Sequence, residues 1–341
     1  MNGRKVVLLC LILLLASTTA QAKIVFSSER NGVQGIYVMD DDSSNLTLLR
    51  AGDRWVPFPY CWSPDGKQIL FQSFGLSLMN ADGTNVRKLI DDGGGNIGRG
   101  SFSPDGKSIV FNWSFRKNDK LQYNIYVLNI KTLKVEEIAS QIMGSNCDWS
   151  PDGKHIIFSE WITTGVHSTI WITDADGHNP RPLIPKPPVG AEFTINRSRP
   201  RWSPDGQQIV FTEREYKTVR VPNVGESPFF KAFRYMICDR NGENIKQLRI
   251  PKEMEGISVD WMDDGESVVF SARAAIPLNR VLPRDFKFPP ANIYKYHIRT
   301  REITRLTNHP GMDETIDWIS DDVLSVTPQG KKKVMWGTLK K

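Results

Sequence analysis

Four copies of the tetrapeptide Ser-Pro-Asp-Gly, spread along the chain, constrain its fold more than any other feature. The copies lie at 63–66, 103–106, 150–153 and 203–206, and Met-Asp-Asp-Gly at 262–265 is a degenerate fifth copy. An aromatic residue stands directly before each copy, and a sixth precedes an eroded copy near the C-terminus: Trp62, Phe102, Trp149, Trp202, Trp261 and Trp318. Consecutive aromatics are 40 to 59 residues apart, so the motif is constant and the intervening loops vary. A period of this size indicates a repeat architecture.

Each copy predicts a tight turn between two strands. Proline fixes φ for the second position of a β-turn, and aspartate and glycine are favoured after it. An apolar segment ending in phenylalanine follows each turn, as in Ile69-Leu70-Phe71, and such a segment suits a strand buried on both faces. A third strand, a second polar turn and a fourth strand complete the unit. Each unit is thus an antiparallel sheet of four strands, the size of one propeller blade.

The two ends of the chain complement each other. Residues 24–49 supply a second, third and fourth strand without a first, and the segment around Trp318 supplies a first strand. We therefore predict an all-β, six-bladed propeller over residues 23–320, with its ring closed by both termini. Residues 321–341 are expected to form a C-terminal tail, and a seven-bladed ring is the alternative.

The first 22 residues have the pattern of a secretory signal peptide. Arg4 and Lys5 precede an apolar run of 11 residues, and Ala20 and Ala22 suit a cleavage site after Ala22. The run is shorter than the roughly 20 residues that span a bilayer. We expect a periplasmic or secreted protein with no membrane span, and removal of the leader lowers the net charge from +6 to +4.

Composition and cysteine content add two limits. Hydrophobic residues make up 40% and charged residues 24%, which excludes a largely disordered chain and a polytopic membrane protein. Cys61, Cys147 and Cys238 remain after the leader, each in a strand-like segment, and we predict buried thiols, with one disulfide pair as the alternative. Nucleic acid is not an expected partner at this modest charge.

The repeat resembles the WD-type propeller of the TolB family. The shared features are Trp-Ser-Pro-Asp-Gly-Lys, the β-branched pair followed by Phe, Ile-Tyr-Val, and Asp-x-Asp-Gly. The resemblance covers residues 23–320 and implies a periplasmic protein of the envelope. TolB-type proteins carry an α/β domain before the propeller, and we expect no such domain here because the first strand begins right after the predicted cleavage site. Propellers of prolyl-oligopeptidase-type enzymes are also similar, but they accompany a hydrolase domain.

The sequence carries few patterns of catalysis. Gly-x-Ser-x-Gly, a P-loop, a dinucleotide fingerprint and His-Glu-x-x-His are all absent from it. The histidines are scattered over different units: His155, His167, His178, His297 and His309. Asp174-x-Asp176-Gly177 is similar to the start of a calcium loop, but the twelfth position is Pro185, so a hairpin turn is the better interpretation. We expect no catalytic residues, no metal and no cofactor.

The channel at the centre of the ring is the first candidate site. The residues one and three positions before each aromatic point to the same side of the innermost strand. They place mixed charges near one end of the channel: Arg99, Asp148, Arg199, Arg201, Asp260 and Asp317. Two roles remain open for these residues, a binding site for a partner and structural ties between blades, since buried charges need partners in either case.

The long connections are the second candidate site. Residues 213–234, 271–291 and 185–201 are expected to be loops on one face, opposite the Ser-Pro-Asp-Gly turns. They interleave basic and aromatic residues, among them Arg220, Phe229, Phe230, Arg234, Arg284 and Phe286. Such loops indicate an acidic protein or peptide partner. The alternative is that they are solvated surface loops that bind nothing.

We therefore expect an exported, monomeric, non-enzymatic propeller that binds a protein or peptide on its loop-rich face and channel mouth. The alternatives are a lyase or hydrolase of carbohydrates, or a sugar-binding module that stacks exposed Trp113 and Trp161 on sugar rings. A glycan is accordingly the alternative partner. The six aromatics before the turns are expected to be structural anchors between blades.

Overall fold

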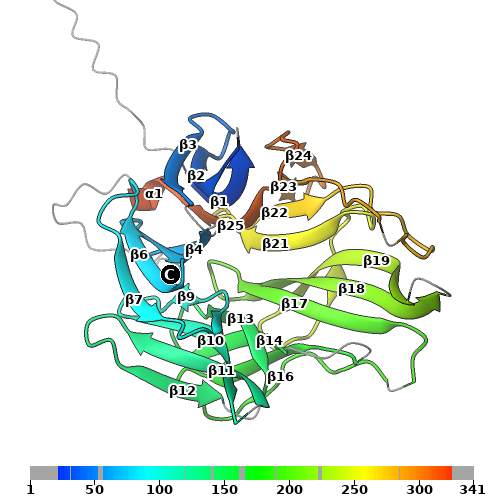
Figure 1. Cartoon of the computed structure of the whole chain (residues 1–341), viewed down its shortest axis with the longest axis horizontal. Helices are drawn as coiled ribbons and strands as arrows, with labels where there is room; N and C mark the ends of the chain where they lie inside the picture. The colour runs from blue at the N-terminus through cyan, green and yellow to red at the C-terminus, as the bar shows by residue number, and fades with distance from the viewer. Residues whose placement is uncertain are drawn as a thin grey trace, which may run out of the picture.

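Six antiparallel blades are arranged in a ring (Figure 1). The computed structural model describes residues 22–30, 32–52, 57–118, 120–139, 142–160, 166–188, 190–221, 225–283 and 285–324. The predicted leader up to residue 21 lies outside the described residues, as do Trp161, Arg284 and the tail after residue 324.

Blade 1 combines the two ends of the chain, and the other five blades follow in order along it. Blade 1 contains β25 (Glu314–Ile319), β1 (Lys23–Arg30), β2 (Val33–Asp40) and β3 (Thr47–Ala51). Blade 2 contains β4 (Phe58–Trp62), β5 (Gln68–Gln72), β6 (Gly75–Asn80) and β7 (Arg87–Asp91). In blade 3 two short segments, β8 (Asn96–Ile97) and β9 (Ser101–Phe102), share the innermost place beside β10 (Ser108–Lys117), β11 (Lys120–Asn129) and β12 (Val135–Ala139).

Blades 4 to 6 repeat the four-stranded order. Blade 4 contains β13 (Gly144–Trp149), β14 (His155–Glu160), β15 (Ile170–Asp174) and β16 (Arg181–Pro182). Blade 5 contains β17 (Thr194–Trp202), β18 (Gln208–Val221), β19 (Gly225–Asp239) and β20 (Lys246–Gln247). Blade 6 contains β21 (Glu255–Trp261), β22 (Ser267–Arg273), β23 (Ala291–His297) and β24 (Ile303–Arg305).

The first strands of consecutive blades contact one another all the way round the ring. The sequence of contacts runs from β25 through β4, β9, β13, β17 and β21 and returns to β25. This closed circuit confirms six blades and excludes the seven-bladed alternative.

The Ser-Pro-Asp-Gly turns form as predicted. In the first copy Ser63 Oγ donates to Asp65 Oδ1 at 2.7 Å, and Gly66 N donates to Ser63 O at 2.8 Å. Gly66 has a φ of +69°, a left-handed conformation that glycine adopts at no steric cost. The same two bonds recur in the other three copies, so one local hydrogen-bond pattern joins the first and second strands of four blades.

The hydrophobic core consists mainly of clusters between neighbouring blades. Trp202 packs with Ile157 and Ile170 of blade 4, and Trp62 packs with Val25 and Ile36 of blade 1. Each of the six inter-blade clusters contains one of the six aromatics, as a buried member or packed against it. Each aromatic thus packs between its own blade and a neighbouring blade.

Blade 1 closes the ring through β25. Ile24 pairs with Trp318 and Val25 with Asp317, all in antiparallel register. β1 pairs with β25 in the place of a second strand, and the chain after β25 forms the short helix α1 (Asp321–Leu324). Val323 and Leu324 pack against the cluster between blades 1 and 2.

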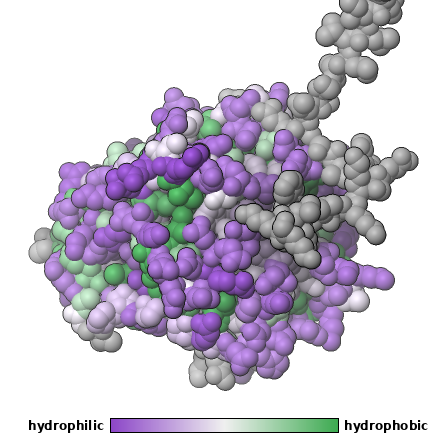
Figure 2. All heavy atoms as spheres, turned by 180° about the vertical axis from the view of Figure 1, so that it is seen from behind, coloured by the Kyte–Doolittle hydropathy of each residue, from purple (hydrophilic) through white to green (hydrophobic). Residues whose placement is uncertain are grey.

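Cys61, Cys147 and Cys238 are buried and free, which confirms buried thiols and excludes a disulfide among them. Burial raises the pKa of the Cys238 thiol to about 12. In the described part of the chain, no helix is long and apolar enough to cross a bilayer. Figure 2 shows one face of the molecule, where hydrophilic residues predominate and hydrophobic ones appear in small areas.

Candidate functional site

The residues directly before the six aromatics converge on the channel. All of them line one cavity of about 270 Å³: Cys61, Ser101, Asp148, Arg201, Asp260 and Asp317. The same cavity borders Pro151 and Pro204 of the Ser-Pro-Asp-Gly turns, so it lies on the turn side of the channel.

The residues three positions before the aromatics line a second cavity. Arg99, Asn146, Arg199, Ser258 and Thr315 surround about 290 Å³. Glu314 and Phe58, which begin strands β25 and β4, also line it, so this cavity lies toward the loop-rich face. Of the six predicted site residues, Asp148, Arg201, Asp260 and Asp317 line the first cavity, and Arg99 and Arg199 line the second, because the innermost strands carry them at two different depths.

Several of these polar groups tie one blade to the next. Trp62 N donates to Asp317 Oδ2 at 2.8 Å, and Trp202 N donates to Asp148 Oδ2 at 2.8 Å. Trp149 N donates to Ser101 Oγ at 2.9 Å in the same arrangement. In each case the side chain of the residue before the aromatic of one blade accepts a hydrogen bond from the backbone N–H of the aromatic residue in the next blade.

Two of the channel arginines also bind within the ring. Arg99 donates to Ile316 O at 2.6 Å and lies 3.6 Å from Asp317. Arg201 Nη1 donates to Pro200 O on its own strand at 2.8 Å and to Cys147 O of blade 4 at 3.4 Å. Asp148, Asp317, Arg99 and Arg201 thus each contact a neighbouring blade or close the ring, and a binding role for them stays a prediction.

Two channel carboxyls favour the protonated form. Burial raises the pKa of Asp148 to about 6. Burial, together with the adjacent Asp260 carboxyl, raises the pKa of Asp317 well above its ordinary value. A carboxyl with a higher pKa in the folded chain than in the unfolded chain binds more protons when folded, so it increases stability as the pH falls through its folded pKa.

We predict that the melting temperature rises as the pH is lowered from 7.5 to 5, and that Asp148→Asn removes part of this rise. Asp263→Asn is the control, because Asp263 borders the same cavity but is exposed. Calorimetry across this pH range measures the effect. A stability curve of Asp148→Asn that runs parallel to that of the parent would contradict the assignment of the titration to Asp148.

The longest predicted loop, 213–234, is not a loop. Strands β18 and β19 continue through it as a hairpin, in which Glu213 pairs with Arg234 and Arg220 with Glu226. The isolated bridge between Phe229 and Val281 places the connection of blade 6 beside this hairpin. The basic and aromatic residues of blade 5 thus lie on a β-hairpin, and the connection of blade 6 lies beside it.

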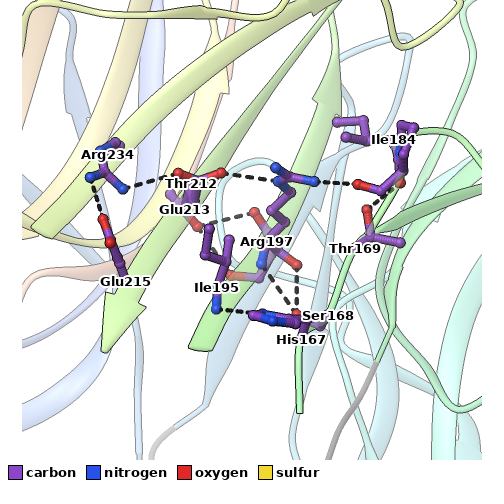
Figure 3. Close-up of polar contacts among 12 residues, drawn as sticks. His167, Ser168, Thr169, Ile184, Ile195, Arg197, Thr212, Glu213, Glu215 and Arg234 are labelled. Atoms are coloured by element: carbon purple, nitrogen blue, oxygen red, sulfur yellow. Dashed lines mark hydrogen bonds and ion pairs between the residues drawn. The ribbon is translucent and has the colours of Figure 1, made fainter. Parts of the chain in front are cut away.

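Most basic residues of this region are paired with glutamates that the sequence argument overlooked. Glu213 accepts from Arg197 at 3.0 Å and from Arg234 at 3.1 Å (Figure 3). Glu215 binds Arg234 and Lys231, Glu255 binds Arg214 and Arg273, and Glu160 binds Lys186. The basic residues of these connections therefore largely belong to an ion-pair network.

The alternation of charges along β18 is a sequence pattern that indicates this network. Glu213, Arg214 and Glu215 alternate along β18, so the two glutamates point to one face and the arginine to the other. Arg234 is cross-strand from Glu213, which makes an ion pair between them the expected contact of a continued hairpin.

The aromatic residues of the hairpin form a small core of their own. Phe230 is 5% exposed and Phe233 is 3% exposed, and both pack with Ile276 and Leu282 of blade 6. Phe286 packs against this cluster, and the ring of Phe229 lies 6.1 Å from that of Phe193 in a tilted arrangement. The expectation that Phe230 is presented to a partner is therefore wrong, because its side chain joins blade 5 to blade 6.

Trp113 is also not the exposed platform that was expected. It is partly buried, with its ring 5.8 Å from that of Tyr126, and its Nε1 donates to Asp92 O at 3.3 Å. Among the described residues, no group of three or more His, Cys, Asp or Glu side chains is arranged to hold a metal ion. The Asp174–Gly177 segment is a hairpin turn, in which Gly177 N donates to Asp174 O at 2.9 Å.

A third cavity, of about 230 Å³, lies on the loop-rich side between blades 4, 5 and 6. Its walls include Asn146, Glu160, Arg199, Arg214 and Arg234. Asn146 and Arg199 also line the second cavity, so the channel and this pocket share a wall. Hydrogen bonds from Arg197 N to Ser168 Oγ and from Ile195 N to His167 Nδ1 hold blade 5 against blade 4 beside it (Figure 3).

The model of the TolB beta propeller domain matches residues 18–184. The Tol-Pal system protein TolB of Francisella tularensis subsp. mediasiatica is 26% identical over 189 residues, which cover 54% of this chain and 41% of the relative. The chain contains a TolB-like propeller. It spans about half the length, or less, of the curated relatives it matches.

Solved structures share the fold of this TolB-like propeller. TolB from Acinetobacter baumannii has a TM-score of 0.64 at 20% identity, over 87% of this chain and 66% of that one. An oligogalacturonate lyase from Vibrio parahaemolyticus has a TM-score of 0.53 at 13% identity, over 84% of this chain and 75% of that one. At these identities the likeness shows the architecture alone, since the same propeller carries unrelated functions.

Proposed function

We propose that this chain is an exported, non-enzymatic TolB-like propeller that binds a protein or peptide partner at the loop-rich mouth of its channel, in an envelope role. The observation that carries the proposal is the polar pocket between blades 4, 5 and 6, which shares Arg199 and Asn146 with the channel. Inter-blade contacts surround this pocket, so its walls are rigid and suited to recognition.

The relatives support the class of partner. The Francisella relative is by its name a protein of the Tol-Pal system, and a solved neighbour is TolB. Export is supported by the basic start, the apolar run and the small residues before Ala22. The N-terminal sequence of the protein isolated from the envelope tests this part directly.

Site-specific photo-crosslinking tests the binding face. A photoreactive amino acid replaces exposed Arg220 on the hairpin, and in a second variant it replaces exposed Lys107 in a Ser-Pro-Asp-Gly turn. A covalent adduct with one defined protein from Arg220 but not from Lys107, reproduced with the two purified proteins, supports the proposal. Equal crosslinking from both faces, or from neither, argues against it.

Charge on the hairpin is expected to affect association. Arg220 and Arg280 are exposed, and neither belongs to the ion pairs of the described chain, unlike Arg234, whose loss would leave Glu213 and Glu215 unpaired. Changing both to Glu should slow association with an acidic partner about tenfold at low salt and have little effect at high salt. The control is Lys107→Glu with Lys154→Glu on the turn face. Stopped-flow kinetics that show equal rates for the parent and the Arg220/Arg280 variant at low salt would refute an acidic partner at this hairpin.

A further inference from the structure

Arg199 differs from Arg214 and Arg234, the other arginines that line the pocket between blades 4, 5 and 6. Its neighbours Arg214 and Arg234 are held by Glu255, Glu213 and Glu215. Arg199 donates from Nη1 to Ser198 Oγ at 3.2 Å, and within the described part of the chain it forms no ion pair. Burial, and the nearby charge of Arg214, lower the pKa of Arg199 to about 10. The fold therefore holds a cation at a site that disfavours charge.

The backbone at Arg199 is in an uncommon conformation. Its φ is +59°, and Asn146 and Thr315 at the same position of blades 4 and 1 have φ values of +52° and +47°. Left-handed conformations are unfavourable for arginine and still more so for β-branched threonine. The pairing of β17 with β18 shifts register between Ser198 and Arg201, which directs Arg199 into the channel. Strain of this kind persists where the surrounding structure imposes it, and it is enriched at binding sites.

A second unsatisfied group faces the same pocket. Glu160 uses Oε1 to bind Lys186 at 2.7 Å, while its Oε2 is buried without a hydrogen-bond partner in the described structure. Glu160 and Arg199 both line the pocket of about 230 Å³. The pocket thus presents to a ligand the guanidinium of Arg199, which has no ion-pair partner in the described structure, and Glu160 Oε2, which accepts no hydrogen bond there.

The size of the pocket limits what enters. Pockets for whole small molecules typically measure roughly 300–1,000 Å³. A volume of about 230 Å³ is smaller and suits one residue of a larger ligand, which continues into the adjoining channel cavity of about 290 Å³.

We propose that Arg199 binds a carboxylate of an acidic peptide segment, and that Glu160 Oε2 accepts an amide N–H of the same segment. Aspartate and glutamate residues supply both groups within one residue, a carboxylate from the side chain and an N–H from the backbone. Guanidinium–carboxylate pairs are bidentate and charge-assisted, so they give the strongest hydrogen bonds available in such a pocket. This inference rests on the proposed function and names the chemistry that the partner presents.

A uronate sugar is the competing source of a carboxylate. Sugars are bound mainly by stacking on flat aromatic faces. Phe233, the aromatic residue of the pocket that contains Arg199 and Glu160, is 3% exposed and presents no face. In the adjoining cavity Tyr60 is 4% exposed, and among its aromatic residues only Phe58 is partly exposed. The walls therefore favour a peptide.

The test begins with a random seven-residue peptide library displayed on phage and selected against the whole protein. Selected peptides are then titrated against the parent, Arg199→Gln, Arg199→Lys and the exposed control Arg220→Gln. We expect Arg199→Gln to weaken binding about 30-fold or more, because one partner of a desolvated charge pair is lost. Replacing the key Asp or Glu of the peptide by Asn or Gln should weaken binding to the parent equally, and should cause no further loss with Arg199→Gln.

Thermal unfolding of the same variants separates binding from a structural role. Removal of a partly buried cation that has no ion-pair partner in the described structure should leave the melting temperature of Arg199→Gln unchanged or raise it. A structural tie would lower it. A large fall in melting temperature together with unchanged peptide affinity of the folded fraction would overturn the inference.

The outcomes also separate this inference from the proposed function. Peptides that bind with equal affinity to the parent and to Arg199→Gln would overturn the role of Arg199 and leave the proposed function standing. Failure of any peptide to bind would count against the proposed function itself. Oligogalacturonate is titrated in parallel, and Arg199-dependent binding of it without peptide binding would replace the peptide by a glycan.

Discussion

A chain truncated before residue 315 should fail to form a stable propeller. The truncation removes most of β25, the strand that pairs with β1. It also removes Ile316, Trp318 and Ile319, which pack between blades. Trp62 N also loses its acceptor on Asp317. Loss of each large core side chain costs about 2–5 kcal/mol, so the three together cost about 6–15 kcal/mol, comparable to the roughly 5–15 kcal/mol that stabilises a typical domain.

Circular dichroism and calorimetry measure this effect. A second truncation after Leu324 separates the contribution of β25 and α1 from that of the residues beyond them. A protein without residues 315–341 that melts like the parent would show that the ring does not depend on its closing strand.

Trp202→Ala should destabilise the protein by about 3–5 kcal/mol, the cost of removing a large aromatic side chain from a core. Trp202 is 6% exposed and packs between blades 4 and 5. Its Nε1 has no hydrogen-bond partner in the described structure, so the cost is one of packing. Denaturant unfolding measures it, with Trp202→Phe as the matched variant that should lose less. A cost below about 1 kcal/mol would place this side chain at the surface.

The fold was predictable because the sequence motifs that specify it act locally, within a few residues of each turn. A Ser-Pro-Asp-Gly turn closes on itself through Ser63 and Asp65, and the aromatic before it is fixed in register by that turn. Six such signals at a constant place in each unit specify the number of blades. The complementary ends then specify how the ring closes.

The candidate site was less predictable because it is built between blades. Sequence spacing placed Arg99, Arg199 and Arg201 at the channel, but not the partners that neighbouring blades supply to them. The pairing of Arg214 with Glu255 joins residues of two blades, and no local pattern specifies it. The left-handed conformation of Arg199 is equally invisible, since arginine carries no sequence signal for a positive φ.

The closing strand also determines when the fold can be completed. Ser27 bonds to Glu314, 287 residues later in the chain, so blade 1 stays unfinished until nearly all other strands exist. At synthesis rates of about 5–20 residues per second, this interval lasts about 15–60 s. Throughout that time β1 presents an unpaired edge, which is a template for pairing with other chains. The same pairing that seals the finished ring therefore makes the growing chain vulnerable, and a factor that shields the edge of β1 would act only during this interval.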